Sequence, residues 1–159
     1  MKKISRLPFI IVSAMLMVSC NSSKHAAREK DVRGTWVLAT IVTEGGDGKI
    51  KDRIFNEAEF GCFIGSEWKF SGGGIGSYLL VDKQKNCPEI KRLFSWTYTP
   101  ASITPAAISF KRLNEKNEPI ETDAFNLTIT ESTKTSMKLR AESLTQVNAP
   151  AIVYNFTRQ

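Results

Sequence analysis

The chain has 159 residues, of which 42% are hydrophobic and 24% are charged, and its formal net charge is +6 at pH 7. This length suits one domain of ordinary size with a single core. From Cys20 onwards the chain carries 19 basic and 16 acidic side chains, a net charge of +3, because Lys2, Lys3 and Arg6 precede that cysteine. A charge this small, with acids interleaved among the bases, excludes a dedicated nucleic-acid-binding protein.

Residues 1–19 are typical of a secretory signal peptide. Basic residues precede a mostly apolar run at residues 8–18, which is shorter than the roughly 20 residues of a permanent membrane span. Cys20 directly follows the small residue Ser19, and this junction resembles the lipobox of bacterial lipoproteins. That resemblance implies that Cys20 is lipidated, becomes the new N-terminus and anchors the chain to the membrane, in the cell envelope and at the outer membrane. The alternative is an ordinary signal peptide with an incidental cysteine.

Residues 20–32 are polar and are expected to form a flexible tether, followed by one folded domain at residues 33–159. The only histidine, His25, lies in the tether. A domain without histidine cannot build Ser-His-Asp or Cys-His catalytic arrangements. We therefore expect no enzymatic activity and no cofactor.

Apolar and polar residues alternate along most of the domain, which is the period of half-buried β-strands. One stretch, residues 50–59, instead has apolar residues at helical spacing and is expected to form a short helix that lids one end. Most connections are short, which favours antiparallel neighbours in up-and-down order and a closed all-β barrel without exposed edges. The predicted strands are eight, at about 34–43, 66–71, 75–82, 92–99, 106–113, 120–130, 135–144 and 151–158.

The glycines between Trp68 and Tyr78 could belong to a phosphate-binding loop or to a hairpin turn. A phosphate-binding loop leads into a helix N-terminus, whereas the residues that follow Gly76 form a strand pattern. Gly72–Gly74 are therefore predicted to be a tight turn, in which glycine adopts positive φ at little cost.

Cys62 and Cys87 are an even pair in an exported chain, which favours a disulfide; the alternative is two reduced, buried thiols. Two cysteines without a domain histidine do not provide the four ligands of a structural zinc site.

Other charged residues give no clear site. Two carboxylate pairs, Glu57 with Glu59 and Glu121 with Asp123, could support acid–base chemistry but are expected to lie on the solvated surface. The basic pairs Lys91-Arg92 and Lys111-Arg112 are too short to form a nucleic-acid-binding stripe.

At Gly34-Thr35-Trp36 the first predicted strand begins with the Gly-x-Trp seen at the start of lipocalins. Together with the lipobox at Cys20, the segment from Cys62 to Trp68, Asn86-Cys87-Pro88 and the Trp96 strand, the chain resembles the lipocalin-like lipoproteins of Gram-negative envelopes. The resemblance implies an eight-stranded barrel in which the first tryptophan closes one end.

A barrel of this size can either fill its interior with side chains or hold one small ligand. We expect a small apolar or amphipathic ligand at the mouth, with inward aromatic side chains forming the site. The alternatives are that these residues simply pack as core, that the loops bind a protein partner as an inhibitor or immunity-type lipoprotein, or that the chain serves envelope assembly. The candidate ligand-binding residues are Trp68, Tyr78, Trp96, Tyr98, Phe110 and Tyr154.

Overall fold

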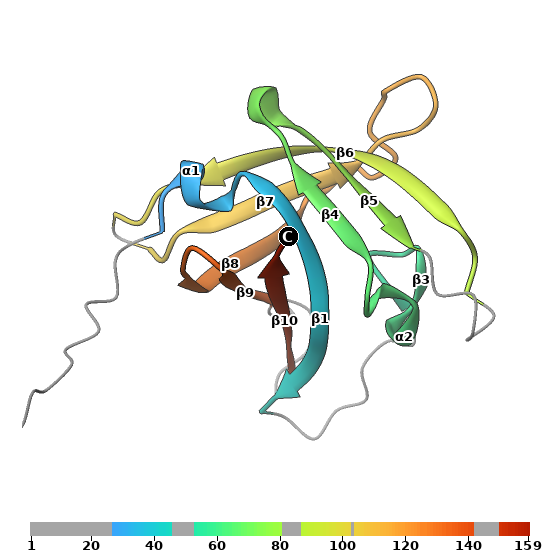
Figure 1. The fold of residues 1–159 in the computed structure, drawn as a ribbon. Helices are drawn as coiled ribbons and strands as arrows, with labels where there is room; N and C mark the ends of the chain where they lie inside the picture. Colours follow the sequence, from blue (N-terminus) through green and yellow to red (C-terminus); the bar gives the residue numbers. More distant parts are fainter. Residues whose placement is uncertain (1–26, 46–52, 81–86, 103, 142–149) are drawn as a thin grey trace, which may run out of the picture.

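The computed structural model describes residues 27–45, 53–80, 87–102, 104–141 and 150–159. Their main feature is a closed antiparallel barrel of eight strands in the order β1-β10-β9-β8-β7-β6-β5-β4 (Figure 1). The up-and-down barrel predicted from the alternating pattern is thereby confirmed. The strands are β1 Gly34–Glu44, β4 Glu67–Phe70, β5 Ile75–Leu80, β6 Ile90–Thr99, β7 Ala107–Arg112, β8 Phe125–Ser132, β9 Ser136–Ala141 and β10 Ala151–Arg158.

Strand β1 closes the barrel by pairing with a strand on each side. Its residues 34–37 pair with β4, so that Trp36 lies opposite Trp68, while residues 36–44 pair with β10, with a register shift between Leu38 and Thr40. Each of the eight barrel strands therefore has two antiparallel neighbours, and the barrel sheet, as described, has no free edge.

The alternating residues meet inside the barrel, as the two-residue period of a strand requires. Strand β7 shows the pattern most clearly, because Ile108, Phe110 and Arg112 are buried while the residues between them are partly exposed. The fully buried large side chains are Trp36, Trp68, Tyr78, Tyr154, Phe63, Phe70, Phe94, Phe110, Leu38, Leu80, Ile108 and Met137.

Two predicted elements differ from the structure. The expected helix at residues 50–59 is wrong where that segment is described, because β2 Arg53–Ile54 and β3 Ala58–Glu59 form a small hairpin and the helix, α2, is Phe60–Phe63. The strand predicted at 120–130 starts only at Phe125. Glu121, which precedes it, turns towards Arg112 and hydrogen-bonds to its backbone and guanidinium groups instead of continuing the ladder.

The first strand begins at a packed end of the barrel. Helix α1 (Glu29–Val32) precedes β1, and Val32, in the expected tether, is fully buried. Trp36 donates its indole N–H to the Val32 carbonyl at 2.8 Å, and the Arg158 guanidinium lies 4.3 Å from the Trp36 ring centroid. Residues 29–32 are thus part of the folded domain rather than of a free tether.

The glycine-rich turn between β4 and β5 is confirmed. Gly72–Gly74 form a short 3-10 turn in which Gly73 and Gly74 have φ of 81° and 76°. Cys20 and the signal sequence lie outside the described residues. None of the helices in the described part of the chain has the length and apolar character of a membrane span.

Candidate functional site

One end of the barrel is covered by a segment that does not belong to its wall. We call residues 53–63, which contain β2, β3 and α2, the lid. The two lid strands form a separate two-stranded sheet, and Figure 1 shows this part of the chain at the end opposite α1. The lid lies between β1 and β4 in the chain, and its two strands pair with each other and not with the barrel wall.

The turn between the two lid strands has an unusual backbone. Phe55 and Asn56 have φ of 49° and 52°, in the left-handed region. Asparagine tolerates this conformation, whereas a bulky side chain such as phenylalanine adopts it at a cost of about 1–2 kcal/mol. Contacts elsewhere must offset this cost, and such strained residues gather at ligand sites and switch segments.

The ring of Phe55 provides the apolar part of those contacts. It enters the barrel, where its centroid lies 5.0 Å from that of Phe110, 5.2 Å from Tyr154, 5.3 Å from Phe125 and 5.7 Å from Trp68. Most of these pairs are edge-to-face, and each such aromatic pair contributes about 0.5–1.5 kcal/mol beyond area burial. Phe55 therefore fills the centre of an aromatic cup formed by the barrel wall.

The lid is also held covalently. Cys62 in α2 forms a disulfide with Cys87, which confirms the predicted pairing, and the two Cα atoms are 5.5 Å apart. The two cysteines are 25 residues apart in the sequence, and closing a loop of this length stabilises the fold by about 3 kcal/mol in the chain-entropy model.

The structure brings together four of the six candidate ligand-binding residues. Trp68, Tyr78, Phe110 and Tyr154 are all buried near the lid, with Trp68 stacked on Tyr78 at 4.6 Å. Trp96 and Tyr98 lie further along β6, towards the α1 end. Trp96 donates its indole N–H to the Ser71 carbonyl, and Tyr98 donates its hydroxyl to the Ala27 carbonyl.

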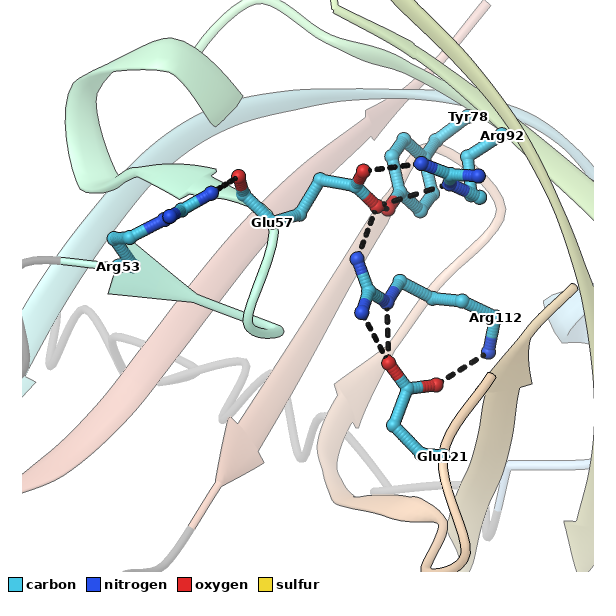
Figure 2. Close-up of polar contacts among 6 residues, drawn as sticks. All are labelled: Arg53, Glu57, Tyr78, Arg92, Arg112 and Glu121. Atoms are coloured by element: carbon cyan, nitrogen blue, oxygen red, sulfur yellow. Dashed lines mark hydrogen bonds and ion pairs between the residues drawn. The ribbon is translucent and has the colours of Figure 1, made fainter. Parts of the chain in front are cut away.

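Beside this aromatic cup lies a group of buried charges that joins the lid to the wall. Glu57 is the centre of the group, and its side chain is only 5% exposed. Its carboxylate accepts hydrogen bonds from Arg92 Nη2 at 2.5 Å, from Arg112 Nη1 at 2.6 Å and from the Tyr78 hydroxyl (Figure 2). These three donors come from neighbouring strands, β5, β6 and β7. We call the set of Glu57, Tyr78, Arg92, Arg112 and Glu121 the carboxylate cluster.

Two further contacts complete the carboxylate cluster and support its centre. Glu121 accepts from Arg112 Nε at 2.6 Å, so that Arg112 bridges two carboxylates. Arg53 of the lid donates to the backbone carbonyl of Glu57, as Figure 2 shows, and so supports the turn rather than the carboxylate.

The donors around Glu57 keep it ionised. Burial alone would raise the pKa of Glu57, but hydrogen bonds from Arg92, Tyr78 and Arg112, with the charge of Arg112, outweigh burial and lower the pKa to about 2. Burial, the hydrogen bond to Glu57 and the charge of Glu57 together raise the pKa of Tyr78, which keeps its hydroxyl a donor. The three wall residues therefore hold the carboxylate of Glu57 in its ionised form.

The expectation that Glu57 lies on the solvated surface is wrong, and Arg92 and Arg112 were expected only as parts of short basic pairs. Strand periodicity contained a signal for both arginines. Arg92 is two and four residues from Phe94 and Trp96 on β6 and therefore lies on the same face of the strand. Arg112 likewise shares a face of β7 with Phe110 and Ile108, and these four apolar residues face the interior. No comparable signal exists for Glu57, because it lies in a turn.

Within the described residues, no three His, Cys, Asp or Glu side chains are grouped in a way that could hold a metal ion. Comparison of the chain with protein-family models, with curated proteins and with solved structures gave no match.

Proposed function

We propose that this chain is a lipid-anchored envelope protein that holds a small apolar or amphipathic ligand at the lidded mouth of a lipocalin-like barrel. The N-terminal lipobox and Cys20 support the anchor, and Gly34-x-Trp36 at the start of a closed eight-stranded barrel supports the likeness in fold. The proposed role is binding rather than catalysis.

One observation carries the proposal: the central ring of the aromatic cup belongs to the lid and not to the wall. Trp68, Phe110 and Tyr154 surround Phe55, whose backbone has a strained positive φ. Withdrawal of the lid turn leaves a concave aromatic surface of the kind that small-molecule sites use. An apolar ligand of similar size then takes the place of the Phe55 ring.

Binding of the neutral fluorophore N-phenyl-1-naphthylamine tests this role in the folded domain. We expect saturable binding that quenches tryptophan emission, and the quenching should be lost in Trp68→Phe but retained in Trp96→Phe. Trp96 is the matched control because it contacts Phe70 and the glycine-rich turn, away from the lid.

A second pair of variants tests the part played by the lid. Replacement Phe55→Ala removes the tethered ring and should tighten fluorophore binding by about tenfold or more, because the binding-competent open state becomes more populated. Ile75→Ala is the control, since Ile75 is 45% exposed and lies at the end of β5 that is remote from the lid. Absence of saturable binding in all of these proteins, with a protein partner co-purifying instead, would contradict the proposal and support the inhibitor-type alternative.

A further inference from the structure

The carboxylate cluster has a feature that lid attachment alone does not require. All the donors to the Glu57 carboxylate, namely Tyr78, Arg92 and Arg112, are contributed by wall strands, while the acceptor is contributed by the lid. The wall strands are fixed in the barrel by continuous pairing, with Tyr78 opposite Arg92 and Phe94 opposite Arg112. The backbone positions of the three donors are therefore set by the barrel wall and not by Glu57.

The charge balance of the carboxylate cluster depends on the lid. With Glu57 in place, two arginines face two carboxylates, and the cluster is neutral. Without Glu57, Glu121 remains as the partner of Arg112, while Arg92, which is 27% exposed with the lid in place, loses its carboxylate partner, and the cluster carries one uncompensated positive charge. Unpaired charge in such a position is unfavourable, so that departure of Glu57 favours entry of another anion.

The donor set matches the geometry of a carboxylate. Arg92 binds both oxygens of Glu57, through Nε at 3.1 Å and Nη2 at 2.5 Å, which is the planar two-point contact that guanidinium groups make with carboxylates. The Tyr78 hydroxyl adds a third, uncharged donor. The site thus provides directional contacts to one carboxylate group.

The apolar neighbour of this carboxylate is Phe55, two residues earlier in the same turn. Its ring lies in the aromatic cup between Phe110 and Tyr154, while Glu57 reaches the arginines. The turn thus places an apolar group and a carboxylate side by side, and the barrel wall receives each of them separately.

We propose that Glu57 is a tethered occupant of a carboxylate-binding site, and that the ligand of this protein is an amphipathic monocarboxylate. Its head group replaces Glu57 on Arg92, Arg112 and Tyr78, and its apolar body replaces the Phe55 ring. This inference rests on the proposed function, and it adds the chemical class of the ligand and the group with which that ligand competes.

Paired probes of equal chain length, decanoate and decanol, test the inference by calorimetry on the folded domain. In Glu57→Gln the affinity ratio of decanoate to decanol should rise by about tenfold or more relative to the wild type, because a charge-assisted contact becomes available only to the carboxylate. Adding Arg92→Met to Glu57→Gln should abolish this gain. Arg53→Met is the matched control, since Arg53 binds the Glu57 backbone and its loss should change both affinities alike.

The outcomes separate the two proposals. If decanol binds but Glu57→Gln leaves the ratio unchanged, the carboxylate cluster serves only to hold the lid, and the inference is overturned while the proposed function stands. If neither probe binds any variant, the proposed function fails as well. Should Glu57→Gln not fold, propionate, but not propionamide at equal ionic strength, should restore its folded circular dichroism signal, and failure of this rescue would overturn the inference.

Discussion

Glu57 shows how a single residue in a turn can decide the state of a whole site. Its carboxylate stays ionised in a buried position because three donors hydrogen-bond to it, and not because it is exposed to solvent. Such a buried ion pair is not in itself a source of large net stability, since desolvation offsets most of the attraction. Removing one partner is costly nonetheless, because the other charges remain buried.

Replacement Glu57→Gln should lower the free energy of unfolding by about 3 kcal/mol at pH 7. The pKa of Glu57 is about 2 in the folded protein and near 4.5 without the fold, so its contribution is fully present above pH 4.5 and is lost as pH falls towards 2. The difference between the two proteins in denaturant unfolding should therefore shrink across that range. The control, Glu67→Gln on the exposed face of β4, should change stability by less than about 0.5 kcal/mol at either pH, and a pH-independent difference would contradict this assignment.

At the scale of an element, the hairpin formed by β4 and β5 contains glycines with two different roles. Gly73 and Gly74 adopt positive φ in the turn. Gly76 lies within the strand, and a Cβ there would come within 2.3 Å of the Phe94 ring and 2.7 Å of the Lys69 carbonyl oxygen. Gly76 thus makes room for Phe94 in the core, a role that turn chemistry does not reveal.

The substitution Gly76→Ala should destabilise the fold by about 1–3 kcal/mol through overpacking. Gly61→Ala is the matched control, because a Cβ at Gly61 in α2 has no neighbour within 4 Å, and its effect should stay within about 1 kcal/mol. Thermal unfolding of the two variants measures the difference, and equal melting temperatures would contradict the packing role of Gly76.

At the scale of the whole molecule, the ring of eight paired strands is complete without the strands of the lid. The wall is a continuous ring of paired strands, while the lid is attached by the Cys62–Cys87 disulfide, by Phe55 and by Glu57. Neither lid strand pairs with a wall strand, so that displacement of the lid would leave the strand pairing of the wall unbroken.

The double replacement Cys62→Ser and Cys87→Ser should therefore lower stability by about 3 kcal/mol while leaving the strand content of the barrel intact. Chemical denaturation gives the stability, and far-ultraviolet circular dichroism before denaturation reports the strands. Fluorophore binding should become tighter, because the lid loses its covalent attachment. Loss of the strand signal in native buffer would show instead that the lid is required for barrel closure.

The sequence alone determined the barrel, the hairpin glycines and the disulfide pair. Alternation along a strand is a local property, and it assigned residues such as Trp68, Phe110 and Tyr154 correctly to the interior. Tertiary structure alone decided that the lid is a hairpin, that Glu57 is buried, and that Trp96 and Tyr98 are separated from the other candidate residues. These features depend on which loop enters the barrel and at which end. They are fixed by contacts between residues far apart in the sequence, such as Glu57 and Arg112, and a local sequence pattern does not encode such contacts.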